Sequence, residues 1–103
     1  MALGPELIAG FTCAPAPAAG SLGWRCNGGK TGAGVVVINL VEPVNVAKDL
    51  ILVSVDGTNP NGSITYVVSG GGLVVTVNTA NNANASTDAG FSFAAYRVQP
   101  YAQ

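Results

Sequence analysis

Residues 63–79, SITYVVSGGGLVVTVNT, alternate apolar and polar side chains on both sides of three consecutive glycines. Alternation with a period of two is typical of a β-strand that has one buried face. The glycines favour a turn, because glycine adopts positive φ at little steric cost. The stretch therefore predicts an antiparallel hairpin of strands 63–69 and 73–79, whose inward side chains are Ile64, Tyr66, Val68, Leu73, Val75 and Val77.

Three further segments around this hairpin have the composition of strands. VVVINLV (35–41) and LILVSVDG (50–57) are short apolar runs, as expected of strands covered on both faces. In GFSFAAYRV (90–98), Phe91 and Phe93 are expected to point inward, so that Tyr96 and Val98 point outward. Since no segment has a convincing helical period, the strands predict an all-β protein. We expect an antiparallel β-sandwich or jelly-roll-like domain over residues 34–103.

Residues 1–33 differ from the rest of the chain in their content of glycine, proline and alanine. Pro5, Pro15 and Pro17 exclude a long helix there, because each removes a backbone donor. The segment predicts an extended N-terminal arm with one short strand near residues 7–12. Its isolated apolar side chains are expected to contact a neighbouring subunit, and the candidates are Leu3, Leu7, Ile8 and Phe11.

The chain is poor in charge for a soluble protein. Charged residues make up 9% of its 103 residues and the net charge is −1, so little repulsion keeps copies apart. This composition favours an assembly, although Asn, Thr, Ser and Gly could instead solvate a monomer. The four basic residues are scattered singly, which argues against nucleic acid as a partner. No apolar run is as long as the roughly 18 residues of a membrane helix, so a membrane partner is not expected either.

Catalytic and metal chemistry have little support in the sequence. The chain has no histidine and its five carboxylates are isolated along the chain, so we do not expect an enzyme. GWRCNGGKTG (23–32) has a tryptophan where a phosphate-binding loop needs its first glycine. DGTNPNGS (56–63) has one carboxylate, which favours a turn over a calcium loop. No cofactor or metal is expected.

Cys13 and Cys26 flank a segment rich in Pro, Gly and Ala. A disulfide between them would close a loop and add about 3 kcal/mol in the chain-entropy model. Two cysteines in a chain without a convincing export signal are more often free thiols. Both states remain open at this point.

Trp24 and Arg25 are candidate surface anchors. Trp, Tyr and Arg dominate the binding energy of protein interfaces, and aromatic rings also stack on sugars. Tyr66, Tyr96, Arg97 and Tyr101 belong to the same residue classes. Each of these side chains could equally fill the core.

The succession DLILVSVDG, SITYVV, GLVVTVNT and DAGFSFAAYRVQ resembles small β-sandwich structural proteins of tailed-bacteriophage virions. In that group a last strand of the type F-x-F-x-x-Y-R-V closes the domain, and the likeness covers roughly residues 34–99. It implies a non-enzymatic capsid decoration (cement) protein that binds the major capsid protein on the outer surface of a phage head. The alternative within the group is a tail-fibre or receptor-binding domain, in which Trp24 and Tyr96 would stack on cell-surface carbohydrate.

The end of the chain predicts self-association. Tyr96, Val98 and Tyr101 lie close together there, with Arg97 as the charge among them. Exposed on a closing strand, these side chains would form an unprotected apolar edge. We therefore expect a homotrimer with Tyr96 and Val98 at its centre, and with the Asn-rich loop before Asp88 near its symmetry mates.

Overall fold

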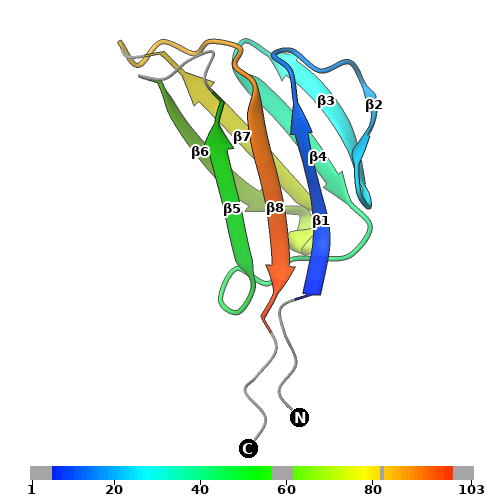
Figure 1. Ribbon diagram of the computed structural model, residues 1–103. Helices are drawn as coiled ribbons and strands as arrows, with labels where there is room; N and C mark the ends of the chain where they lie inside the picture. The colour runs from blue at the N-terminus through cyan, green and yellow to red at the C-terminus, as the bar shows by residue number, and fades with distance from the viewer. Residues whose placement is uncertain (1–5, 57–61, 82, 99–103) are drawn as a thin grey trace, which may run out of the picture.

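The computed structural model describes residues 6–56, 62–81 and 83–98, which form two antiparallel sheets packed face to face (Figure 1). The prediction of an all-β sandwich is therefore confirmed. The described elements are β1 (Glu6–Cys13), β2 (Gly20–Gly23), β3 (Cys26–Gly32), β4 (Val35–Leu40), β5 (Leu50–Val55), β6 (Ser63–Ser69), the 3-10 turn η1 (Gly70–Gly72), β7 (Val74–Ala80) and β8 (Phe91–Arg97).

One sheet has the strand order β1-β8-β5 and the other has the order β2-β3-β4-β7-β6. The sheets are joined on one side, where the backbones of Gly10 and Trp24 exchange two hydrogen bonds with N–O distances of 3.1 and 2.9 Å. On the other side, β5 and β6 are the last strands of their sheets (Figure 1). The sandwich is thus bridged at one point on one side and ends in two edge strands along the other.

The core lies between the two sheets and draws on alternate residues of the central strands. Phe91 and Phe93 of β8 are buried, and both rings contact Phe11 of β1 at centroid distances of 5.6 and 5.7 Å. The opposite sheet contributes β-branched side chains, which fit the surface of a pleated sheet well. The side chains with no exposed surface include Ile8, Ile38, Val75 and Val77.

The predicted hairpin is present as β6, η1 and β7. Its three glycines all have positive φ, and a Cβ on Gly72 would lie 2.2 Å from the carbonyl oxygen of Val44. Val75 and Val77 are buried as predicted, and Ile64 and Val68 pack against the core. The prediction is wrong for two side chains, Tyr66 and Leu73, which are exposed. Tyr66 lies on an edge strand whose inner face is only partly covered, and Leu73 belongs to the turn before β7.

The short strand expected near residues 7–12 is present as β1, but the extended arm and the domain boundary at residue 33 are wrong for residues 6–33. β1 pairs with β8, and β3 pairs with β4, so this segment belongs to both sheets. The strand β3 was not predicted, because its glycines give no alternation of apolar and polar side chains. One of them permits close approach: a Cβ on Gly28, whose φ is +139°, would lie 1.9 Å from the carbonyl oxygen of Val37. Residues 1–5 of the expected arm lie outside the described residues.

Candidate interaction face

The outer surface of the β1-β8-β5 sheet is apolar over half its length. The register places Leu7, Tyr96 and Leu50 in one row across the three strands. The next row consists of Gly10, Ala94 and Leu52, and the third of Thr12, Ser92 and Ser54. The apolar part of this surface, the Tyr96 face, consists of Leu7, Leu50, Leu52, Ala94, Tyr96 and Val98.

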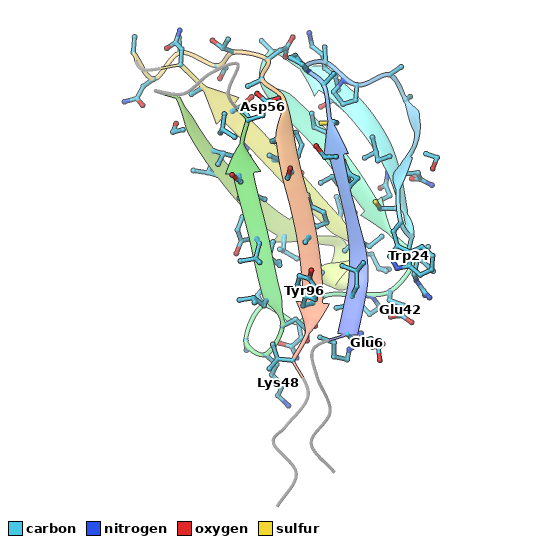
Figure 2. All side chains as sticks on the ribbon, viewed as in Figure 1. Glu6, Trp24, Glu42, Lys48, Asp56 and Tyr96 are labelled. Carbon is cyan, nitrogen blue, oxygen red and sulfur yellow. The ribbon has the colours of Figure 1, made fainter. Side chains whose placement is uncertain are left out.

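The face is well exposed to solvent. Leu7 is 39% exposed, Leu50 46% and Leu52 50%, and Val98, directly after β8, is 51% exposed. Tyr96 is half-buried at the centre of the row, as Figure 2 shows on β8. Because exposed apolar side chains are gathered here and not scattered singly, the face has the character of an interaction surface.

Alternation along each strand explains why these side chains point outward. In β8, Phe91, Phe93 and Ala95 are buried, which leaves the side chains between them on the outer surface. In β1, Ile8 and Ala9 are both buried, and the register shifts between Leu7 and Ala9. This bulge lets Leu7 and the later outward residues of β1 share one face despite the broken alternation.

Four charged side chains, Glu6, Arg25, Glu42 and Arg97, form ion pairs at the end of the sandwich near Tyr96. Arg97 Nη1 lies 3.8 Å from Glu6 Oε1 and 3.5 Å from Glu42 Oε2. Glu42 Oε1 in turn lies 3.1 Å from Arg25 Nη2. Glu6 and Glu42 are found at this lower end in Figure 2. Exposed ion pairs of this kind contribute at most about 1 kcal/mol each, but they leave the rows of the Tyr96 face uncharged.

The predicted interface residues are placed partly as expected. Tyr96 and Val98 both point outward, and Tyr96 is the cross-strand partner of Leu7, a predicted arm contact. However, we expected Tyr96 and Val98 on an unpaired edge strand, and this is wrong because β8 is the central strand of its sheet. What these side chains expose is the outer face of the sheet. Leu3 and Tyr101 lie outside the described residues.

Ile8 and Phe11 do not form the expected contact with a neighbouring subunit. Ile8 is fully buried, and Phe11 packs against the two buried phenylalanines of β8. Both side chains belong to the core of the domain itself, because β1 is a strand of the sandwich. Of the described arm candidates, Leu7 alone lies on the exposed surface of the sheet.

Leu50 and Leu52 were missed by the sequence reasoning. The uniform apolar run of β5 predicted a strand covered on both faces, and this is wrong. Ile51 and Val53 pack against the core, whereas the two leucines are half-exposed. The preference for Leu at the outward positions and for β-branched residues at the inward ones is visible in the sequence, but it does not by itself show which face is covered.

Trp24 and Arg25 lie at the turn between β2 and β3. The Trp24 side chain is 57% exposed, and in Figure 2 it lies beyond β1 from Tyr96. The two rings therefore do not form one platform for stacking on a sugar. Arg25 has a φ of +58°, pairs with Glu42, and has a buried Nε without a hydrogen-bond partner.

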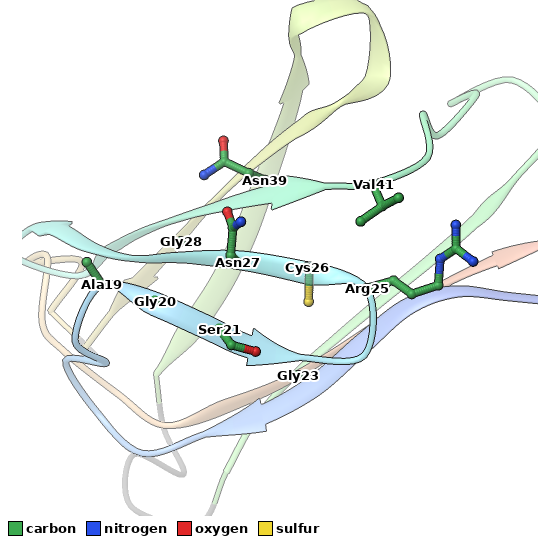
Figure 3. A pocket seen from close by; sticks show the side chains of 10 residues that line it. All are labelled: Ala19, Gly20, Ser21, Gly23, Arg25, Cys26, Asn27, Gly28, Asn39 and Val41. Atoms are coloured by element: carbon green, nitrogen blue, oxygen red, sulfur yellow. The ribbon is translucent and has the colours of Figure 1, made fainter.

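An open hollow lies over β2, β3 and the end of β4. Arg25, Asn27, Asn39 and Ser21 contribute its polar side chains, and Val41 lies at its rim (Figure 3). Three glycines also line it, Gly20, Gly23 and Gly28. Trp24 lies in the chain between two of the lining residues, Gly23 and Arg25.

Asp88, at the end of the Asn-rich connection before β8, binds the end of β3 and the turn that follows it. Asp88 Oδ1 accepts a hydrogen bond of 2.8 Å from the Gly34 N–H, and its Oδ2 lies 2.6 Å from Lys30 Nζ. The hydrogen bond from Lys30 and that from Gly34 lower the pKa of Asp88. This connection precedes β8 and lies at the opposite end of that strand from Tyr96 (Figures 1 and 2), so it does not lie beside Tyr96 within one copy.

The two cysteines are free thiols in the structure. Burial raises the pKa of both Cys13 and Cys26, which disfavours the reactive thiolate. Within residues 6–56, 62–81 and 83–98, no cluster of three His, Cys, Asp or Glu side chains could hold a metal ion. In the same part of the chain no helix has the length and apolarity needed to cross a membrane.

Comparison with protein-family models, with curated proteins and with solved structures finds no match to this chain. The functional argument therefore rests on the Tyr96 face and on the strand pattern of the sequence.

Proposed function

We propose that this protein is a non-enzymatic structural module whose copies associate through the Tyr96 face, and that the assembled copies decorate the outer surface of a phage head. The observation that carries the proposal is the exposed apolar face on a chain with 9% charged residues. The resemblance of its strand pattern to phage virion proteins supplies the biological setting. The partner in this proposal is the major capsid protein.

The Tyr96 face offers a useful amount of binding energy. Complete burial of a leucine side chain contributes about 2 kcal/mol, so covering each half-exposed leucine or valine contributes about 1 kcal/mol. The four such side chains of the face together offer roughly 4 kcal/mol per copy, before the entropic cost of association. A single contact between two such faces would be weak, so a stable assembly needs several contacts that add.

A homotrimer fits this requirement. Three copies that pack Tyr96 and Val98 around an axis remove these side chains from water. A trimer on a shell also contacts several capsid subunits at once, so that modest contacts add through effective concentration. The near absence of charge on the face allows the copies to approach without like-charge repulsion.

Solution assembly tests the face directly. In dilute solution we expect the parent protein to sediment as an oligomer and Tyr96→Asp to sediment as a monomer, because the substitution places a charge on the apolar face. Val67→Asp is the matched control, since Val67 is exposed on β6 of the other sheet. A monomeric parent, or a Tyr96→Asp variant that assembles as the parent does, would refute assembly through this face.

A tail-associated receptor binder is the second candidate. The exposed Trp24 directly precedes Arg25, which lines the hollow together with Asn27 and Asn39. This arrangement favours the receptor binder, because stacking and amide hydrogen bonds recognise sugars. Copy number separates the two functions. Mass spectrometry of purified particles should find on the order of hundreds of copies for a decoration protein, since multivalent coating of a shell needs many subunits. A few copies per particle would reject decoration and favour the receptor binder.

A further inference from the structure

In the described part of the chain, one edge of strand β5 is unpaired. Within the described residues, β8 is the strand that pairs with β5, and the pairing runs without a register shift from Leu50 to Val55. The N–H of Asp56 donates to the carbonyl oxygen of Gly90 at 3.0 Å. Since antiparallel residues alternate in direction, the N–H and C=O groups of Leu50, Leu52 and Ser54 also face β8. Those of Ile51, Val53 and Val55 face away from β8, along the free edge.

This edge lacks the features that normally block strand addition. Edge strands are usually protected by lysine, proline, a bulge or an inward charge. The sequence of β5, LILVSV, contains no charged residue and no proline, and its register is unbroken. The edge of β1 on the other side of the same sheet differs, because its Gly10 bonds to the backbone of Trp24.

The outer surface next to each free edge distinguishes β5 from β6. The outward side chains of β6 are Ser63, Thr65, Val67 and Ser69, of which three are polar. The outward side chains of β5 include the half-exposed Leu50 and Leu52 of the Tyr96 face. Pairing along β5 would therefore extend an apolar surface, whereas pairing along β6 would extend a mainly polar one.

We propose that β5 pairs antiparallel with β5 of a second copy across a twofold axis, so that two β1-β8-β5 sheets become one continuous sheet. An uncharged edge offers nothing to an acidic or basic partner strand, and it meets an identical edge without like-charge repulsion. The twofold axis aligns the N–H and C=O groups of Ile51, Val53 and Val55 with those of the second copy. It also joins the two Tyr96 faces. This edge contact is distinct from the packing of faces proposed above and does not depend on it.

Residue-resolved hydrogen exchange by NMR tests the pairing. In dilute protein the amides of Ile51, Val53 and Val55 should exchange fast, while those of Leu52 and Ser54 are protected by β8. In concentrated protein, where sedimentation detects association, all five should be protected. The amides of β6 that face away from β7 serve as the internal control and should stay fast. Fast exchange at Val53 in the associated protein, or protection of the β6 edge in its place, overturns the proposal.

A proline at the edge provides the matching variant. Val55→Pro removes an N–H that faces the free edge and leaves the hydrogen bonds between β5 and β8 in place. Val55→Ala is the control, because it shortens the same side chain and keeps the N–H. We expect the proline variant to raise the dissociation constant of the twofold contact at least about tenfold relative to the alanine variant, which is about 1.4 kcal/mol.

Equal dissociation constants for the two variants overturn the proposal. In Tyr96→Asp, protection of the β5 edge should persist at high concentration. Sedimentation of this variant reports on the Tyr96 face, and hydrogen exchange at Ile51, Val53 and Val55 reports on the edge of β5. Failure of the proposed function and failure of the edge pairing are therefore distinguishable.

Discussion

The substitution Gly34→Ala tests how the Asn-rich connection is held to the sandwich. Gly34 lies in the turn between β3 and β4 with a φ of +68°. A Cβ at this position would lie 2.4 Å from the carbonyl oxygen of Thr79 and 2.9 Å from the backbone nitrogen of Thr87. Both neighbours are backbone atoms, so they cannot move aside as the end of a side chain could. The alanine must therefore separate the turn from β7 and from the connection to β8.

The expected loss of stability has two parts. The left-handed conformation costs an alanine about 1 kcal/mol at this φ. Separation of the turn also weakens the 2.8 Å bond from the Thr79 N–H to the Gly34 carbonyl and the 2.8 Å bond from the Gly34 N–H to Asp88. Each such bond contributes about 1 kcal/mol, and more where the acceptor is charged. The total is about 3–4 kcal/mol, a large part of the roughly 5–15 kcal/mol of a whole domain.

Gly71→Ala is the matched control. Gly71 has the same φ of +68°, and a Cβ there would meet nothing within 4 Å. The control should therefore lose the conformational part alone. Since about 1 kcal/mol shifts the melting temperature of a domain of this size by roughly 4 °C, Gly34→Ala should melt about 8–12 °C below Gly71→Ala. If thermal unfolding followed by circular dichroism finds that the two variants melt together, the close approach at Gly34 has no energetic consequence and the reasoning is refuted.

Three further predictions concern single groups. The pKa of Asp88 is lowered by the hydrogen bonds from Lys30 and Gly34. Its contribution to stability is therefore fully present above the ordinary aspartate pKa of about 3.9 and is lost as the pH falls from there through the folded-state pKa. In Asp88→Asn the melting temperature should depend less on pH below about 3.9 than in the parent, and an unchanged acid profile would contradict this. Burial raises the pKa of the thiols of Cys13 and Cys26, so both should react slowly with a thiol reagent at neutral pH and promptly after denaturation; equal rates in both states would be inconsistent with burial. Phe91 is fully buried, so Phe91→Ala should lower the free energy of unfolding by about 3–5 kcal/mol in denaturant titrations, and a cost near zero would place the ring outside the core.

Local pattern was sufficient for the hairpin and for the last strand. The burial of Val75 and Val77 could be predicted because period-two alternation depends on one strand alone. The outward position of Tyr96 follows from the same rule. The strand β3 was not predictable in this way, since its glycines carry no apolar signal. β1 was harder to predict than β8 because its bulge at Ile8 and Ala9 breaks the alternation.

The composition of the Tyr96 face depends on pairing between strands that are distant in the sequence. Leu7, Tyr96 and Leu50 become neighbours only when β8 lies between β1 and β5. A uniform apolar run such as β5 does not show whether one or both of its faces will be covered. The pairing order, which sets the face, is a property of the whole chain and has no local signature.

The pairing of β1 with β8 also has a mechanical consequence. The described chain enters the sandwich at Glu6 and leaves it at Arg97, and these two residues are direct partners in an antiparallel ladder. Tension applied through the two ends would load the hydrogen bonds of this ladder one pair at a time, as in the opening of a zipper, and would meet little resistance. A copy held by its outer face carries no such tension. The fold is therefore poorly suited to serve as a link in a chain that carries load through its two ends.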